Sequence, residues 1–225
     1  MPEIAPLLIV LFVALAVVGM VFAYLQQQAR RKALAAFARS RGMLFDPGKY
    51  AGLDGRFPTF DCLRRGRGRY AYNRIYGDWN GRDCLLFDYR YVTGSGKNRR
   101  THHFSGAILA ATLPLKPLVI RPEGLFDKMA GFLGFDDIDF ESAEFSREFY
   151  VKSPDRKWAY DVIHARTMEL LLAGPRYSIE FDHAHAIVYD RRTFSVGEFT
   201  AAVGLAEGIL DGLPEYLVRQ QADGT

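Results

Sequence analysis

The segment Gly94–Lys97 has the order of glycines and lysine that closes a phosphate-binding P-loop. In the full pattern, G-x-x-x-x-G-K-[S/T], the loop connects a strand to a helix, and backbone amides at the helix N-terminus hold the phosphate. Here Tyr91 stands where the first glycine belongs, and Asn98 follows the lysine. Strand-like segments also flank the turn on both sides. We therefore interpret it as a polar hairpin turn and predict no nucleotide or other cofactor.

Three further residues could bind a metal ion. His183 and His185 are spaced so that both imidazoles can chelate, and Asp182 offers a third ligand. They occupy the tip of a predicted hairpin, where exposed polar turn residues are the simpler interpretation. The acidic run 136–141 lacks the glycine and the closing glutamate of an EF-hand loop, which favours a solvated acidic edge. We assign no metal site.

No catalytic residue can be assigned either. The sequence contains no G-x-S-x-G or H-E-x-x-H motif and no Cys/His pairing. His102 and His103 are adjacent on a predicted strand and would face opposite sides of it, so they cannot act together. His164 lies in a helical run, where a satisfied boundary histidine is expected. Cys62 and Cys84 lie in hydrophobic, strand-like runs, and we expect buried free thiols in a reducing compartment.

An uncharged, almost wholly apolar run extends from Ile4 to Leu25. As a helix it would span about 33 Å, which matches the hydrocarbon core of a bilayer. A buried core helix is less consistent with this length and uniformity. A cleavable signal peptide is the stronger alternative, because residues 21–23 form a passable cleavage pattern. Residues 1–3 contain no Lys or Arg, however, so we predict a transmembrane anchor over residues 1–25, with residues 4–25 in the bilayer.

Cations follow the apolar run instead of preceding it. By the positive-inside rule this flank stays in the cytoplasm, which places the N-terminus outside the cell membrane and the globular part inside. Residues 26–42 continue in strong helix formers up to Gly42, and we predict a juxtamembrane helix there. The cations of this flank are Arg30, Arg31, Lys32, Arg39 and Arg41.

The average composition of the 225 residues hides a division in charge. The chain is 49% hydrophobic with a net charge of +3, which excludes a disordered, collagen-like or disulfide-rich chain. Residues 1–135 carry 20 Lys+Arg against 9 Asp+Glu, whereas residues 136–225 carry 9 against 17. We predict a basic β-rich half, 43–135, and an acidic α+β half, 136–225, within one compact domain, 43–225.

The cations of the basic half cluster on two predicted turns. Solvated hairpin tips explain such clusters, but a membrane anchor also holds them beside the anionic inner leaflet. We hypothesise that this leaflet is their partner. Nucleic acid is the less favoured partner, because the nearby tyrosines have a place in the sheet core. With the juxtamembrane cations, the proposed contacts to anionic lipid are Arg30, Arg31, Lys32, Arg64, Arg65, Arg67, Arg69, Lys97, Arg99 and Arg100.

Between residues 57 and 120 the hydrophobic pattern has a period of two. Asn80-Gly81 stands between two alternating segments and is the strongest short hairpin signal. The pattern predicts an antiparallel meander followed by a helix. The predicted segments are strands 69–76, 82–92, 101–111 and 115–121 and a helix over about 125–132.

The second half mixes strand and helix signals. Ser153-Pro154 is typical of an N-cap with proline at the first helical position, and Ser195-x-x-Glu198 is a capping box. The fold class predicted for the whole chain is α+β, an N-terminal transmembrane helix followed by an antiparallel sheet meander with covering helices. The predicted strands are an extended stretch over 140–151 and a hairpin of 177–181 and 186–189. One predicted helix begins at 153, helix resumes or continues through 168–172, and the last helix begins at 195.

Three stretches resemble a known family. Gly77–Arg82, Phe87–Tyr91 with the glycine-rich turn after it, and Ile138–Ser153 are similar to segments of a family of bacterial, often actinobacterial, membrane-anchored proteins of unknown function. The resemblance covers roughly residues 30–215 and includes the preceding apolar helix. It implies the architecture of a membrane-anchored domain and supplies no active site.

Together these features predict a non-catalytic interaction or scaffold module at the inner face of the membrane, with an unidentified protein partner. The alternative is a membrane-associated hydrolase or a small-ligand-binding domain. A deep pocket holding a histidine or carboxylate with a perturbed pKa would favour the alternative. A flat apolar patch or an open sheet edge would favour partner binding.

Overall fold

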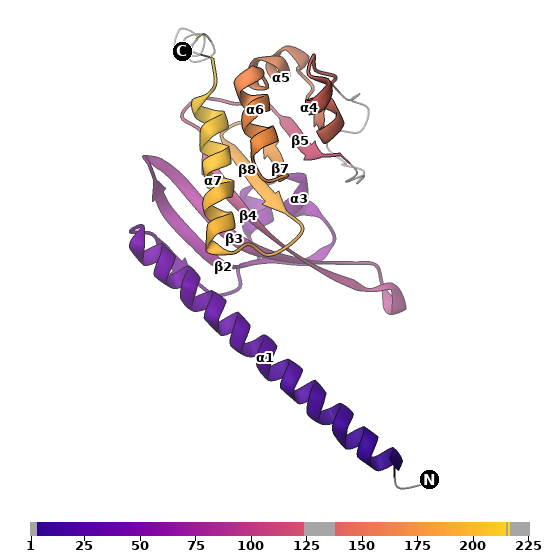
Figure 1. Cartoon of the computed structure of the whole chain (residues 1–225). Helices are drawn as coiled ribbons and strands as arrows, with labels where there is room; N and C mark the ends of the chain where they lie inside the picture. The colour runs from indigo at the N-terminus through magenta and orange to yellow at the C-terminus, as the bar shows by residue number, and fades with distance from the viewer. Residues whose placement is uncertain (1–3, 124–137, 215, 217–225) are drawn as a thin grey trace.

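The computed structural model describes residues 4–123, 138–214 and 216. Its first element is one continuous helix, α1 (Ile4–Ser40), which passes through the predicted anchor and the predicted juxtamembrane segment without a break (Figure 1). Large apolar side chains are exposed along it between Ile9 and Leu25. Among the described residues, α1 is the one helix that is long and apolar enough to cross a membrane.

α1 ends in a Schellman motif built on Gly42. Gly42 has a φ of +68°, a left-handed value that glycine adopts without a steric penalty. The Gly42 amide donates to the Arg39 carbonyl (3.1 Å) and the Met43 amide to the Ala38 carbonyl (2.8 Å), which satisfies the last carbonyls of the helix. The chain turns at Gly42, as predicted, and enters the sheet.

Eight strands form one sheet in the order β1-β2-β3-β4-β8-β7-β5-β6, and neighbouring strands are antiparallel. The predicted α+β class, with an antiparallel sheet after an N-terminal helix, is confirmed. Asn80 (φ +53°) and Gly81 (φ +82°) turn β2 into β3 with the paired positive angles of a type I′ hairpin. The strands are β1 (Leu44–Asp46), β2 (Arg67–Trp79), β3 (Arg82–Thr93), β4 (Arg100–Ala110), β5 (Leu118–Pro122), β6 (Phe149–Lys152), β7 (Ser178–Phe181) and β8 (His185–Asp190).

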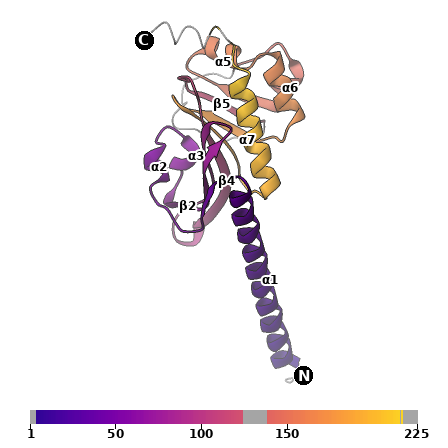
Figure 2. The same cartoon turned by 90° about the vertical axis from the view of Figure 1, so that its left-hand side faces the viewer.

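Helices cover both faces of the sheet, as Figure 2 shows. α2 (Leu53–Arg56) and α3 (Asp61–Arg64) pack on the face to which β3 contributes Leu85, Phe87 and Tyr89. The opposite face carries the larger core, which contains the end of α1 and most of the later helices. Those helices are α4 (Ala143–Glu148), α5 (Arg156–Val162), α6 (Ala165–Ala173) and α7 (Val196–Asp211).

The stretch 140–151, predicted as extended, contains a short helix before its strand. Ser142 caps α4 by accepting a hydrogen bond from the Phe145 amide at 3.2 Å, and β6 begins only at Phe149. A helix of six residues is too short to show a period in the sequence. The helix predicted over 125–132 lies outside the described residues.

Two further local predictions were wrong. The N-cap of α5 is Asp155, which accepts a hydrogen bond from the Trp158 amide at 3.0 Å. The Ser153 hydroxyl donates instead to the Pro117 carbonyl at 2.8 Å. Cys62 lies in α3 and not in a strand, although it and Cys84 are buried free thiols, as expected.

Candidate functional site

The end of α1 is joined to the sheet by an ion pair. The Arg30 guanidinium contacts the Asp88 carboxylate of β3 at two points, Nη1 to Oδ2 at 2.5 Å and Nη2 to Oδ1 at 2.8 Å. The Asp88 side chain is 0% exposed and that of Arg30 is 26% exposed. A bidentate pair with so little access to water is stronger than an ordinary surface ion pair. We name the Arg30–Asp88 pair the latch.

Two further side chains and one backbone carbonyl form hydrogen bonds with the latch. Asn73 Nδ2 (2.8 Å) and Ser105 Oγ (2.5 Å) also donate to the Asp88 carboxylate. Arg30 Nε and Nη2 donate to the Phe194 carbonyl at 3.0 and 2.6 Å. Asn73 has a φ of +48° at a register shift in β2, and such irregularities re-aim side chains. The buried carboxylate is therefore satisfied by donors from α1, β2 and β4 together.

Apolar contacts extend the junction beyond the latch. Leu34 and Ala38 follow Arg30 on the same face of α1 and are completely buried in the core. Nearer the helix end, the Arg41 guanidinium lies 4.2 Å from the centroid of the Trp79 ring, and the Phe37 ring lies 6.3 Å from it. The last turns of α1 are thus part of the tertiary structure of the domain, which fixes the direction in which the apolar part of the helix leaves it.

The two basic turns predicted from the sequence lie at the same end of the sheet. Arg67 pairs with Val92 in the β2–β3 ladder, and Thr93 pairs with Arg100 in the β3–β4 ladder, so the start of β2 adjoins the β3–β4 turn. This turn contains a 3-10 helix, η1 (Gly96–Asn98), and joins two strands, as predicted for the P-loop-like segment. The exposed cations at this basic end are Arg64, Arg67, Lys97, Arg99 and Arg100.

The remaining predicted lipid contacts have other surroundings. Arg30 pairs with Asp88 in the latch and is 26% exposed. Arg69 pairs with Asp54 at 2.8 Å. Arg65 is half-buried and lines a cavity. Beside Arg30 on α1, the other two cations are the half-buried Arg31 and the exposed Lys32.

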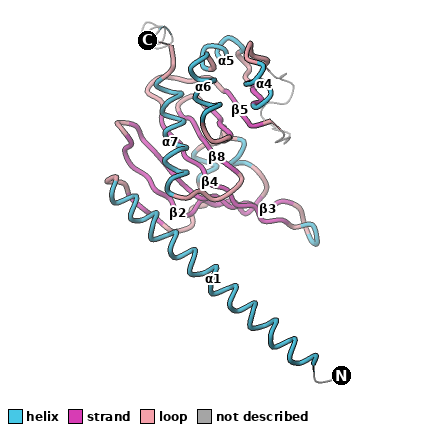
Figure 3. Tube along the Cα trace, viewed as in Figure 1, coloured by secondary structure: helices cyan, strands magenta, loops and turns pink. Residues whose placement is uncertain are grey.

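The β3–β4 hairpin projects from the domain toward the side on which the N-terminal part of α1 extends. Figures 1 and 3 show the tip of the hairpin and the N-terminus of α1 on the same side of the domain, with α1 inclined to the hairpin. In the turned view of Figure 2, α1 extends below the sheet, and α5 and α6 lie at the opposite end of the domain. The basic end therefore faces the side of the apolar helix.

The paired histidines of β4 serve the packing of the sheet. The His102 ring stacks on Tyr91, with 4.8 Å between centroids and 12° between planes, and its Nε2 shares a 2.7 Å hydrogen bond with Thr93 Oγ1. The His103 Nδ1 lies 3.1 Å from the Tyr72 hydroxyl. The two imidazoles have different partners and different exposure, so they do not act as a pair.

The other candidate metal ligands close turns. The Asp182 carboxylate accepts hydrogen bonds from two backbone amides of its own turn, and its Oδ1 lies 3.3 Å from His185 Nδ1. His183 is exposed. His164 precedes α6, and its Nε2 lies 2.7 Å from the Gly212 carbonyl. Within the described residues, no group of three or more His, Cys, Asp or Glu side chains is placed to hold a metal ion.

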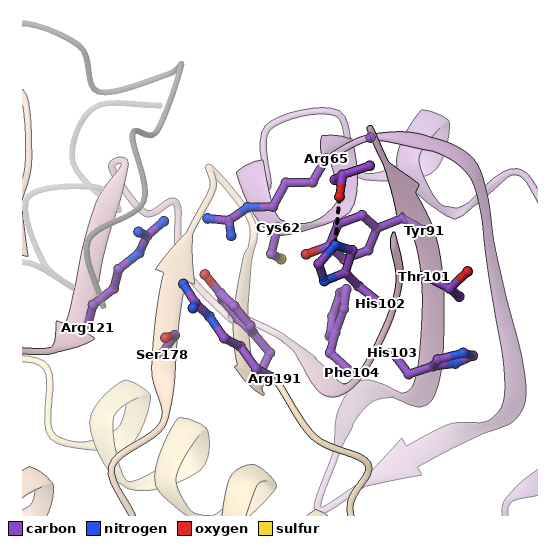
Figure 4. A pocket seen from close by; sticks show the side chains of 13 residues that line it. Cys62, Arg65, Tyr91, Thr101, His102, His103, Phe104, Arg121, Ser178 and Arg191 are labelled. Carbon is purple, nitrogen blue, oxygen red and sulfur yellow. Dashed lines mark hydrogen bonds between the residues drawn. The ribbon is translucent and has the colours of Figure 1, made fainter. Parts of the chain in front are cut away.

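A cavity of about 680 Å³ opens on the face of the sheet that α2 and α3 cover. Three arginines line it, Arg65 at the end of α3, Arg121 on β5 and Arg191 just after β8 (Figure 4). Arg65 is among the residues predicted to contact lipid, whereas Arg121 and Arg191 have no signal in the sequence, because no local pattern connects residues so far apart in the chain. The rest of the described lining includes Cys62, Tyr91, His102, Phe104, Ser178 and Tyr189.

A cysteine and a histidine in one cavity raise the question of nucleophilic catalysis. Burial raises the pKa of the Cys62 thiol well above its usual range, and the nearby Glu180 adds to the rise. The nucleophile is the thiolate, which this environment disfavours. In the described part of the chain, Cys62 is a free buried thiol and the His102 Nε2 is shared with Thr93. The cavity has space for a ligand but does not activate this cysteine.

A buried acid lies behind the cavity wall. The Glu180 carboxylate accepts hydrogen bonds from the Tyr189 hydroxyl and from the Asp61 amide, both at 2.7 Å. Burial raises the pKa of Glu180. Both carboxylate oxygens are occupied by the protein itself, so Glu180 supports the wall of the cavity.

No protein-family model and no curated protein matches the sequence. Among solved structures, the crystal structure of the mycobacterial trehalose monomycolate transport factor A, TtfA, has a similar fold. The TM-score is 0.63, the sequence identity is 13%, and the alignment covers 82% of this chain and 96% of the other. An identity this low shows a shared fold alone. The mycobacterial source of the neighbour agrees with the resemblance to actinobacterial proteins.

Proposed function

We propose that this protein is a single-pass, membrane-anchored, non-catalytic module whose folded domain works on the cytoplasmic face of the cell membrane. α1 would cross the bilayer with its N-terminus outside, and the basic end of the sheet would contact the anionic inner leaflet. The observation that carries the proposal is the latch, because it fixes α1 to the domain with the basic end turned toward the apolar part of the helix.

Distances along the two elements are compatible with contact to lipid. From Arg30 back to Leu25, the last residue of the apolar run, α1 rises about 8 Å. From Asp88, the other member of the latch, to Thr93 at the end of β3, the strand extends about 17 Å. The end of β3 therefore lies farther from the latch than Leu25 does. The hairpin would reach the membrane surface even if it is inclined to the axis of α1.

The energetics are also adequate for a tethered domain. Each Lys or Arg near an anionic leaflet contributes on the order of 1 kcal/mol, and this contribution decays within a Debye length of about 8 Å. The five exposed cations of the basic end would bind weakly as a free domain. Attached to α1 they are held beside the leaflet permanently, so a weak contact is sufficient to orient the domain.

The orientation across the membrane rests on the flanking charges. Arg31, Lys32, Arg39 and Arg41 follow the apolar run, whereas the three residues before it contain one Glu and no Lys or Arg. The positive-inside rule then places the domain in the cytoplasm. A reporter fused to the C-terminus should be active in the cytoplasm, and activity on the outer side alone would overturn this orientation.

The absence of catalysis is supported by the chemistry of the described cavity. Its thiol is kept protonated by burial. Of its two histidines, His102 is held by a stacking contact and a hydrogen bond, and His103 is hydrogen-bonded to Tyr72. The structural neighbour is named a transport factor, a role that needs no bond to be made or broken. We infer that this chain likewise acts through binding, with an unidentified protein as one partner. A hydrolase is less well supported, because the environment of Cys62 disfavours its thiolate.

Lipid contact can be tested with the full chain in nanodiscs. A cysteine introduced as Ser95→Cys at the hairpin tip would carry a fluorophore, while the buried native thiols stay unlabelled. Lipids with a quencher at the headgroup should quench it when anionic lipid is present, and salt near 0.5 M should restore the signal. Charge reversal of Lys97, Arg99 and Arg100 should abolish the quenching.

The matched control reverses three exposed cations at the opposite end of the domain. Arg147, Lys157 and Arg166 lie on α4, α5 and α6 and give the same change in net charge. This variant should be quenched as strongly as the wild type. Equal loss in the two triple variants, or quenching that ignores both salt and lipid charge, would refute the contact.

A further inference from the structure

The arginine-lined cavity uses none of the five exposed cations of the basic end. Arg65 comes from the end of α3, Arg121 from β5 and Arg191 from the segment after β8. Figure 4 shows their three guanidinium groups turned toward a common region in front of Cys62. Arg121 is only 4% exposed, so its charge acts where water screens it weakly.

Three guanidinium groups directed at one region give it a positive potential that attracts an anion. Arg121 also interacts with the buried Glu180. Guanidinium presents a planar fork of donors that matches the oxygens of phosphate and carboxylate. Phosphate is the better match for three cations, because it carries up to two negative charges and three terminal oxygens. The charged side of the cavity therefore favours a phosphate group.

The other side of the cavity is aromatic. The rings of Phe104 and Tyr189 lie 5.8 Å apart, and those of Tyr91 and Phe104 lie 6.3 Å apart. His102 is held parallel to Tyr91 and fixed by Thr93, so this side is ordered without a ligand. A volume of about 680 Å³ accommodates a small organic molecule in addition to a phosphate. An apolar or ring-shaped body fits against these aromatic side chains.

We propose that this cavity binds an organic phosphate, with the phosphate held by Arg65, Arg121 and Arg191 and the apolar body packed against Tyr91, Phe104 and Tyr189. The site is non-covalent, since Cys62 is a buried thiol and Glu180 is bound within the wall. Gly66 shapes the rim: it has a φ of +61°, and a Cβ there would lie 2.3 Å from the Val92 carbonyl oxygen. The ligand is either a soluble phosphate ester or the headgroup of a lipid, and both share this chemistry.

The test uses the full chain in nanodiscs of zwitterionic lipid, which leaves the contact of the basic end with anionic lipid out of the measurement. The probes are phenyl phosphate, inorganic phosphate, phenol and a short-chain phosphatidic acid below its micelle concentration, and binding is measured by calorimetry. Phenyl phosphate should bind more tightly than inorganic phosphate, and phenol should not bind. Tighter binding of the phosphatidic acid would assign a lipid source, and the reverse a soluble ester.

The decisive variant is Arg191→Gln, because Arg191 is exposed and its replacement is expected to preserve the fold. Loss of one charge-assisted contact should weaken binding of phenyl phosphate about tenfold. Arg166→Gln, an exposed arginine on α6, is the matched control and should bind as the wild type does. The proposal is overturned if neither phosphate ester binds more tightly than roughly 1 mM, or if Arg191→Gln and Arg166→Gln bind equally well.

Discussion

Replacing Arg30 by methionine removes the cation of the latch and leaves the Asp88 carboxylate buried. Methionine keeps the length of the stem, so the packing of α1 on the sheet is largely preserved. The carboxylate, with 0% exposure, retains only the donors from Asn73 and Ser105. Breaking a buried pair by removing one partner costs about 3–5 kcal/mol, and the 26% exposure of Arg30 places the expected loss near the lower end.

A second substitution separates loss of charge pairing from loss of packing. In Arg30→Met/Asp88→Asn the uncompensated charge is gone, while the amide can still bond to its neighbours. We therefore expect the double variant to be more stable than Arg30→Met alone, by about 1–2 kcal/mol. A second mutation that restores stability is the signature of a buried charge left without its partner.

The assay is urea unfolding of the full chain in detergent micelles. The buried Trp79 and Trp158 report on the domain through their fluorescence. Lys32→Met removes an exposed cation two residues along the same helix and should change the unfolding free energy by less than about 0.5 kcal/mol. If Arg30→Met costs no more stability than Lys32→Met, or if the double variant is no more stable than Arg30→Met, then the latch does not stabilise the fold.

Two further predictions concern buried titratable groups. Burial raises the pKa of Glu180 above its usual 4.5, so as pH rises this carboxyl group ionises in the unfolded chain before it ionises in the folded one. The wild type should therefore lose stability relative to Glu180→Gln from about pH 4.5 upward. Urea unfolding at a series of pH values measures this, and parallel curves would contradict it. Burial also raises the pKa of Cys84 to about 12 and that of Cys62 well above its usual range. Iodoacetamide at neutral pH should therefore spare both thiols in the folded protein and label both in urea, as followed by mass spectrometry, and fast labelling of folded Cys62 would count against the cavity described.

Much of the fold follows from local signals in the sequence. The Asn80-Gly81 hairpin forms because both residues accept positive φ, and it fixes the register of β2 against β3. The capping box of α7 forms as predicted, with the Glu198 amide donating to Ser195 Oγ at 3.3 Å and the Ser195 amide donating to the Glu198 carboxylate at 2.7 Å. The turn and the capping box each depend on two to four residues, so they can be recognised in a single sequence.

The latch and the cavity depend on contacts that have no local signal. On β3, Asp88 alternates with Phe87 and Tyr89 and therefore lies on the opposite face of the strand, where a charged residue is normally solvated. Its burial becomes visible only when α1, distant in the chain, covers that face and brings Arg30 to it. The same holds for Arg121 and Arg191, which strand order alone brings near α3.

The latch would make the proposed membrane contact and the cavity parts of one geometry. The cavity is lined by Tyr91, Thr93 and His102, which belong to the hairpin whose tip forms the basic end. If α1 holds that end against the leaflet, the cavity lies close to the membrane surface, and a phosphate on a lipid would need to move only a short way out of the headgroup layer to reach it. A flexible linker in place of the latch would average this orientation and remove the advantage of a lipid over a soluble ester. The affinity for phosphatidic acid embedded in an anionic bilayer, compared between the wild type and Arg30→Met, therefore measures whether the direction set by Arg30 and Asp88 serves binding.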